Sequence, residues 1–224
     1  MSTSITTPGQ DSPFPSGTLV LVHGAGSGPW VFEGWSERFP RLAVTAVDLH
    51  AGLDVATASM HDYARRVERA ASSRGAIWLC GWSMGGLVAL MAAQRVRPSG
   101  LVLIEASPPA EVQGGDPSVV TRTGTFDPEK VYGAFPAGTR ARPESQRARD
   151  QRKRGISVPS VPCRCLVVYG DSFPEDRGRN LAARYGADEL HVPGVDHWGL
   201  LGEPAVTRSI ETWIHEQRSP VRPA

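Results

Sequence analysis

The sequence is poor in cysteine, in net charge and in long apolar runs. Its three cysteines are an odd number in 224 residues, and none has the spacing of a zinc ligand with a histidine partner. We therefore expect buried, unpaired thiols in a reducing cytoplasm rather than a disulfide framework. A net charge of +1 gives no reason to expect nucleic acid or a membrane surface as a partner. No apolar run approaches the ~20 residues that a membrane helix needs.

The first residues also lack the basic start and apolar centre of a secretory signal. Residues 1–17 are polar and rich in Ser, Thr and Pro, which predicts a disordered lead-in. The remaining 207 residues, 18–224, are long enough for one domain with a single sizeable core. A composition that is 40% hydrophobic and 21% charged is typical of globular proteins.

Short apolar runs alternate with helical patterns along this domain. The predicted strands are 18–22, 42–49, 76–80, 101–104, 165–169 and 189–192. The predicted helices are 29–39, 59–74 (with Ser59 as its cap), 84–96, 174–185 and 204–216. The strands are continuously apolar, as expected when helices cover both faces of a sheet. This order predicts an α/β fold with a mostly parallel sheet of about six strands and helices on both faces.

One segment, residues 107–161, interrupts the alternation. It is rich in Pro, Gly and charge, and a structureless link of that length would be unusual, so we expect it to fold over the sheet as a small lid. Residues 140–154 contain seven basic side chains. With Pro143 at a first helical position and Gly155 at the end, this stretch predicts a polar surface helix. It is interpreted either as a solvated charged face or as a positive rim that favours anionic or carrier-bound substrates.

Ser83 stands in the sequence Gly81-Trp82-Ser83-Met84-Gly85. Gly-x-Ser-x-Gly is short enough to occur by chance, so its context decides. Here it follows an apolar strand and opens an apolar helix. A sharp strand-to-helix turn exposes the serine hydroxyl above the sheet, and the helix N-terminus supplies unpaired N–H groups where an oxyanion forms. The motif therefore predicts that Ser83 is a nucleophile.

A serine hydroxyl needs a general base at neutral pH. Of the six histidines, His197 follows the last predicted strand and precedes the terminal helix. That position is at the carboxyl edge of the sheet, where catalytic groups gather in open α/β sheets. We expect His197 to be the base and acid, whereas His23, before a glycine-rich loop, is interpreted as a positioning residue.

These three motifs together resemble the α/β-hydrolase family, from residue 18 nearly to the end. HGAG resembles the oxyanion loop of that family, GWSMGG its nucleophile elbow and DHWG its histidine loop. The resemblance implies an oxyanion hole formed by the backbone N–H groups of Ala25 and Met84. HGAGSGPW is especially similar to plant esterases and hydroxynitrile lyases. In the lyases a lysine follows the catalytic histidine, and Trp198 stands there instead. The antiparallel strands that usually precede the first parallel strand are missing, so the fold is a trimmed version.

The acid of the triad does not stand at its customary position. In the family an aspartate usually stands three residues after the glycine that ends its strand, and counting from Gly170 gives Phe173. Two carboxylates compete. Asp171 is displaced by two positions, and Glu105 ends the preceding apolar strand in a context that resembles the haloalkane dehalogenases, whose triad acid follows this earlier strand. A buried charge needs a partner, which favours Glu105, while Asp171 has the ordinary role of capping a turn. Glu105 is preferred and Asp171 stays open.

The predicted function is a serine hydrolase that cleaves an ester or thioester of a small organic acid, without a metal or an organic cofactor. Three tryptophans near the same edge, Trp30, Trp82 and Trp198, are candidates for an apolar acyl pocket or for ordinary packing. The alternative is a non-hydrolytic member of the fold, such as a small-molecule receptor, a cyclase, an epimerase or a lyase. A dinucleotide-binding fold is disfavoured because Gly24, Gly26 and Gly28 read G-x-G-x-G.

Overall fold

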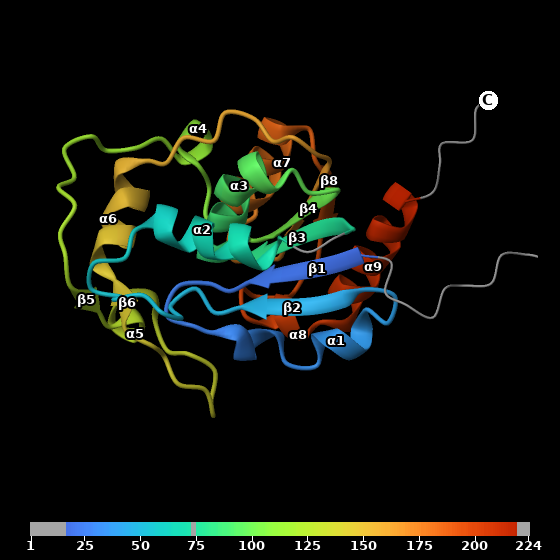
Figure 1. The fold of residues 1–224 in the computed structure, drawn as a ribbon, viewed down its shortest axis with the longest axis horizontal. Coiled ribbons are helices and arrows are strands. Elements are labelled where there is room, and N and C mark those ends of the chain that lie inside the picture. The colour runs from blue at the N-terminus through green and yellow to red at the C-terminus, as the bar shows by residue number, and fades with distance from the viewer. Residues whose placement is uncertain (1–16, 73–74, 219–224) are drawn as a thin grey trace, which may run out of the picture.

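The computed structural model describes residues 17–72 and 75–218 and contains a six-stranded parallel sheet between two layers of helices (Figure 1). Its strands are β1 (Gly17–Val22), β2 (Ala43–Val47), β3 (Ala76–Trp82), β4 (Gly100–Ile104), β7 (Cys165–Tyr169) and β8 (Asp188–His191). They are arranged in the order β2-β1-β3-β4-β7-β8, and every neighbouring pair is parallel. The predicted fold class and strand number are confirmed.

Helices cover both faces of this sheet, which explains why its strands are apolar on both sides. On one face lie α2 (Met60–Ala70), α3 (Met84–Val96) and α7 (Asn180–Tyr185), and on the other α1 (Trp35–Arg38), α8 (Gly199–Gly202) and α9 (Pro204–Arg218) (Figure 1). In β1 the two faces alternate: Val20 belongs to the core under α2 and α3, and Leu21 to the core under α1 and α9. Burial of each such side chain contributes about 1.5–3 kcal/mol.

The capping residue of α2 is confirmed, but the helix is shorter than predicted. Ser59 accepts a hydrogen bond from the Asp62 N–H (3.2 Å), and the Asp62 carboxylate accepts one from the Ser59 N–H (2.9 Å). The helix ends at Ala70 instead of continuing to Arg74, and residues 73–74 lie outside the described residues. The Ser72 hydroxyl donates to the carbonyl of Arg69 (2.7 Å), which competes with helical pairing of the last turn.

Two other predicted helices are each divided into two pieces. The helix expected over 29–39 is a 3₁₀ turn, η1 (Pro29–Phe32), followed by α1. Gly34 separates them with a left-handed backbone (φ 75°) that an α-helix does not contain. The helix expected over 174–185 is a π-helical turn, η2 (Glu175–Arg179), that continues into α7.

Most of residues 107–161, called here the insertion segment, lies beyond the carboxyl ends of β1 and β2, while the part around residues 110–113 lies near α7 (Figure 1). The segment contains α4 (Ala110–Gln113), α5 (Pro128–Tyr132), α6 (Gln146–Arg154) and a two-stranded antiparallel pair, β5 (Thr125–Phe126) and β6 (Glu144–Ser145). It is therefore structured, but the helix predicted from Pro143 begins three residues later. The backbone of Glu144 pairs with Phe126 in the small sheet, and Ser145 caps α6 by accepting from the N–H of Ala148 (3.2 Å).

The remaining expectations concern the ends of the chain, the cysteines and the membrane. The lead-in predicted over 1–17 lies outside the described residues, apart from Gly17, which begins β1. The three cysteines are free; Cys80 and Cys165 are buried and Cys163 is half-buried, so the prediction of burial is wrong for Cys163. Across residues 17–72 and 75–218 no helix combines the length and apolar character needed to cross a bilayer.

Candidate active site

Ser83 lies at the sharp turn between β3 and α3. Its backbone is strained (φ 55°, ψ −127°), a conformation that a residue other than glycine rarely adopts and that marks functional sites. Behind it, nine residues of α3 are buried, which fixes the helix N-terminus against the sheet. The carbonyl of Ser83 accepts hydrogen bonds from the N–H groups of Gly86 (3.0 Å) and Ser107 (2.8 Å). The turn is therefore rigid, and Ser83 itself is only half-buried.

The glycine-rich loop after β1 passes directly beside this turn. A Cβ atom placed on Gly24 would lie 2.8 Å from the Trp82 ring and 3.0 Å from the Cβ of Ser83, so a side chain there would collide. Ala25 follows Gly24, and Met84 takes the first position of α3, where an N–H group has no acceptor within the helix. Gly24 and Ser83 are thus in close proximity, and the two residues predicted for the oxyanion hole, Ala25 and Met84, directly follow them in the chain. Their role in stabilising an oxyanion stays a prediction.

His197 and Glu105 form a short side-chain contact at the site. The Nδ1–H of His197 donates to Oε2 of Glu105 at 2.6 Å. Glu105 is fully buried, and its other carboxylate oxygen accepts from the N–H of Gly170 (2.9 Å). Its backbone has a φ of 37°, again in the strained left-handed region. In the described chain, three residues other than glycine have a positive φ: Ser83, Arg97 and Glu105.

This contact fixes which ring nitrogen of His197 carries the proton. An ionised carboxylate only accepts hydrogen bonds, so Nδ1 must be the donor. In the neutral imidazole Nε2 is then left unprotonated and able to accept a proton from a nucleophile. Among the described residues none is hydrogen-bonded to the Ser83 hydroxyl. Hydrogen bonds between nucleophile and base are often formed only once a substrate is bound.

Asp171, the alternative acid, points elsewhere. Its carboxylate accepts from Nε2 of His191 (3.0 Å) and from the backbone N–H of Gly194 (2.7 Å). These contacts, first the Gly194 N–H and then His191, lower the pKa of Asp171. The side chain is largely exposed and stabilises the loop between β8 and His197. The structure therefore brings Glu105, and not Asp171, to the imidazole.

Three further residues hold the imidazole in place. Trp82 stacks on the ring of His197 (centroids 4.7 Å apart), and its indole N–H donates to the carbonyl of His197 (3.1 Å). The hydroxyl of Ser172 accepts from the N–H of His197 (3.0 Å), and Phe173 meets the ring edge-on at 5.6 Å. Ser172 was not found from the sequence, and no local pattern marks it. Phe173 was found only as the residue occupying the customary place of the acid.

The three candidate pocket tryptophans are brought together beside His197. Trp198 lies between the other two, with ring centroids 6.3 Å from Trp30 and 4.6 Å from Trp82. Phe135 of the insertion segment packs edge-on against Trp198 at 4.9 Å. Trp82 is almost fully buried and also belongs to the core. Their role in lining an acyl pocket stays a prediction.

His23, interpreted as a positioning residue, is buried, and its ring nitrogens contact backbone groups on either side and the hydroxyl of Ser27 (3.4 Å from Nδ1). Nε2 accepts from the N–H of Leu49 (3.1 Å), so the Nδ1–H donates to the carbonyl of Gly24 (2.9 Å). These two bonds tie the glycine-rich loop to the segment after β2. The imidazole therefore fixes the position of the loop beside Ser83.

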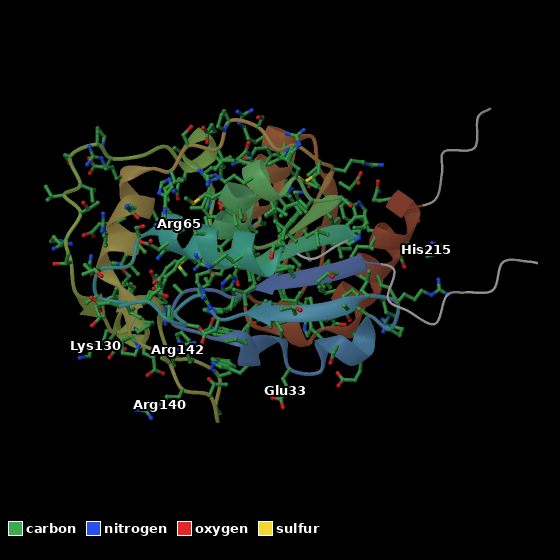
Figure 2. The ribbon with its side chains drawn as sticks, in the orientation of Figure 1. Glu33, Arg65, Lys130, Arg140, Arg142 and His215 are labelled. Atoms are coloured by element: carbon green, nitrogen blue, oxygen red, sulfur yellow. The ribbon has the colours of Figure 1, made fainter. Side chains whose placement is uncertain are left out.

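The insertion segment also contacts this loop, through both backbone groups of Gly26. The N–H of Gly26 donates to Oε2 of Glu144 (3.0 Å), and its carbonyl accepts from the N–H of Arg142 (2.7 Å). Glu144 is fully buried and also accepts from the Tyr63 hydroxyl (2.5 Å) and from Nε2 of His50 (3.3 Å). The Arg142 side chain donates to the Asp48 carboxylate (2.9 Å). It lies beyond the carboxyl ends of β1 and β2 (Figure 2). Sequence reasoning missed Glu144, which stood unmarked among basic residues.

The buried carboxylate of Glu144 makes stability depend on pH. Burial by itself would raise the pKa of Glu144, but the hydrogen bonds and charge of His50, with Tyr63 and Gly26, lower it from 4.5 to about 2. A carboxyl whose folded-state pKa is depressed stabilises the fold above its unfolded pKa, and this contribution disappears as the pH falls through the folded value. We expect the melting temperature of the wild type to exceed that of Glu144→Gln by a margin that shrinks between about pH 4.5 and 2.

The measurement is a thermal melt of both proteins across that pH range. Glu33→Gln is a suitable control, because the Glu33 side chain is exposed and points away from the molecule (Figure 2). Its margin relative to the wild type should stay nearly constant. A Glu144→Gln margin that does not change with pH would contradict the assigned role of this buried carboxylate.

A large cavity lies away from Ser83. Its volume is about 1050 Å³, and it lies between Trp30 and the insertion segment, next to Phe126, Pro128 and Arg142. Neither Ser83 nor His197 lines it, so the chemistry is assigned from the side-chain contacts and not from cavity size. Within the part of the chain that the structure describes, no group of three or more His, Cys, Asp or Glu side chains could hold a metal ion.

Comparison with known proteins agrees with the observed fold. A model of the alpha/beta hydrolase family matches residues 19–209. No curated protein matches the chain. Among solved structures, the RedJ thioesterase from the prodiginine biosynthetic pathway in Streptomyces coelicolor is 20% identical, with a TM-score of 0.61 over 95% of this chain and 90% of that one. ClbQ from the colibactin NRPS/PKS pathway is 12% identical (TM-score 0.67; 90% and 98% covered). Est1E from Butyrivibrio proteoclasticus with bound ferulic acid is 17% identical (TM-score 0.64; 93% and 92% covered).

Proposed function

Because the chain belongs to the α/β-hydrolase family, we propose that it is a serine hydrolase that cleaves an ester or thioester of a small organic acid. The observation that carries this proposal is the contact between His197 and the buried Glu105, next to the strained turn of Ser83. Such a contact leaves Nε2 of the imidazole free to act as a base. A thioesterase among the structural relatives is consistent with this substrate class.

The proposed reaction proceeds in two halves. His197 takes the proton of the Ser83 hydroxyl, whose oxygen attacks the carbonyl carbon, and the N–H groups of Ala25 and Met84 stabilise the resulting oxyanion. The tetrahedral intermediate collapses, the bond to the alcohol or thiol breaks, and His197 returns the proton to that leaving group. A water molecule then gives a proton to His197 and attacks the acyl group on Ser83. The bond between the acyl carbon and the Ser83 oxygen breaks, His197 returns the proton to that oxygen, and the acid is released. Glu105 stabilises the imidazolium in both halves.

The insertion segment takes part in this proposal through the loop that carries Ala25. Glu144 and Arg142 hold the neighbouring Gly26 by its N–H and its carbonyl. Preorganised donors are effective only if they do not move as charge develops. We therefore propose that the segment is a lid that also fixes one side of the oxyanion hole.

Covalent labelling tests the proposal directly. A fluorophosphonate should add one phosphonyl group to Ser83 in the folded protein, because it reacts with a serine activated by a neighbouring base. Mass spectrometry of the labelled peptide identifies the site, and protein denatured before labelling is the control. Absence of an adduct on Ser83 in folded protein would contradict a serine hydrolase and favour a non-hydrolytic member of the fold.

A further inference from the structure

Ser27 is a fully buried serine in the glycine-rich loop after β1, and the proposed reaction does not use it. Its hydroxyl donates to the carbonyl of Gly24 (2.9 Å), and its backbone N–H donates to the same oxygen (3.4 Å). The Nδ1–H of His23 is another donor to this carbonyl (2.9 Å). Three donors therefore converge on one carbonyl oxygen, which has only two lone pairs.

A tight turn from Gly24 to Ser27 fixes these donors. The N–H of Ser27 closes the turn on the Gly24 carbonyl, and Gly26 alone among the four residues has a left-handed backbone (φ 70°). A positive φ at the third residue only is the pattern of a type II turn, which favours glycine there. Nε2 of His23 accepts from the N–H of Leu49 (3.1 Å), which keeps Nδ1–H directed at Gly24. The donors are thus held by the turn itself and by the segment after β2.

The carbonyl of Gly24 and the N–H of Ala25 belong to one peptide group. Ala25 is half-buried, and its N–H has no hydrogen bond within the described residues, although backbone donors shielded from water are rarely left unpaired. A Cβ atom placed on Gly24 would lie 3.0 Å from the Cβ of Ser83. The peptide group is therefore saturated with donors at its oxygen and has an unused N–H, in the segment that contacts the turn of the proposed nucleophile.

We propose that Ser27 is a positioning residue of the oxyanion hole: its hydroxyl, together with His23, holds and polarises the peptide group between Gly24 and Ala25. Hydrogen bonds that a carbonyl accepts draw electron density from the peptide nitrogen towards the oxygen, which makes the N–H a stronger donor. A fixed, stronger donor acts mainly on the transition state, where negative charge develops on the oxygen of the substrate carbonyl. The proposal rests on the proposed function, because Ala25 is one of the two oxyanion donors assigned there.

Ser27→Ala should lower kcat for an activated ester about tenfold while KM stays within about threefold of the wild type. Loss of a whole oxyanion donor costs about a hundredfold to a thousandfold, and this variant weakens one donor without removing it. KM should change less, because the neutral carbonyl of the bound substrate carries little of the charge that the donor stabilises. Initial rates with a p-nitrophenyl ester over a range of concentrations give both constants.

Two further variants separate hydrogen bonding from packing. Ser27→Cys fills the space of the hydroxyl with a thiol, which is a weak donor, so its kcat should stay close to that of Ser27→Ala. Thr207→Val is the matched control and should keep the wild-type kcat: Thr207 is buried in α9, and its hydroxyl also donates to the carbonyl three positions earlier, that of Pro204 (3.2 Å).

Thermal melts show whether each variant is folded, and Ser27→Cys decides the matter if Ser27→Ala does not fold. A wild-type kcat in either variant of Ser27 would overturn the proposal, because the donor would then be dispensable or its volume alone would suffice.

A nuclear magnetic resonance measurement on the free protein separates this proposal from the proposed function. The chemical shift of the Ala25 amide nitrogen responds to hydrogen bonds on the Gly24 carbonyl, because both atoms belong to one peptide group. We expect this signal to move to lower frequency in Ser27→Ala and in Ser27→Cys, and to stay in place in Thr207→Val. If fluorophosphonate does not label Ser83 but the shift is found, the hydrolase proposal fails and the polarised peptide group stands. If the Ala25 signal does not move, the role of Ser27 is wrong whatever the activity.

Discussion

Replacing Ser83 with alanine is expected to lower kcat for an activated ester by about a hundred-thousandfold or more. Alanine removes the atom that attacks the carbonyl, and the histidine then has no hydroxyl to activate. The oxyanion hole and substrate binding remain, so a residual rate above that of the uncatalysed reaction is expected. Initial rates with a p-nitrophenyl ester, together with loss of fluorophosphonate labelling, measure the effect.

The fold should survive this change, because the strained turn is held by its backbone hydrogen bonds and by the buried helix α3. A melting temperature near that of the wild type would show that lost activity is not lost structure. Ser118→Ala is a control, since Ser118 is an exposed serine of the insertion segment that bonds only to Asp116 nearby. If Ser83→Ala kept more than about a tenth of the wild-type kcat, Ser83 would not be the nucleophile.

The second large effect is expected at Glu105. Glu105→Gln should reduce kcat about a thousandfold or more with a smaller change in KM. The N–H of Gly170 requires an acceptor, so the amide oxygen of the glutamine takes the place of Oε1. Its NH₂ group then faces Nδ1 of His197, where the carboxylate accepts a proton in the wild type. The imidazole would have to accept at Nδ1 and carry its proton on Nε2, which is the wrong tautomer for taking the proton of Ser83.

Asp171→Asn is the matched comparison, because it also exchanges a carboxylate for an amide at the carboxyl edge of the sheet. Asp171 contacts His191 and Gly194, so this variant should lose stability in the loop and less than about tenfold in kcat. A pH–rate profile of each variant separates the two roles, since only the residue that contacts His197 should change the ionisation that limits kcat. A collapse in Asp171→Asn with normal turnover in Glu105→Gln would move the acid to Asp171.

Segments with strong local patterns could be predicted from the sequence almost residue by residue. The helix over residues 84–96 and the strand over 165–169 have the predicted bounds, because an uninterrupted apolar run and the turn before it are local features. The helix over 29–39 was predicted as one element but is divided at Gly34. There the chain takes a turn that the hydrophobic pattern does not reveal.

The insertion segment shows the limit of such patterns. Its basic run predicted a solvated helix, and α6 does form there, but Asp150 is buried and bonded to Arg122. Glu144 is buried against Gly26, 118 positions earlier in the chain. Contacts between segments so far apart depend on how the insertion folds onto the sheet, and composition does not encode that.

By itself, the sequence determined the α/β class, a sheet of about six parallel strands and the positions of Ser83 and His197 at one edge. Each of these follows from local order: apolar runs, a Gly-x-Ser-x-Gly turn, and a loop after the last strand. Only the tertiary structure decided which carboxylate faces the imidazole. Glu105 and Asp171 both follow strands at the carboxyl edge, and their side chains point to different histidines. The direction of a side chain depends on the backbone angles and packing at its own turn, which the spacing of residues does not fix.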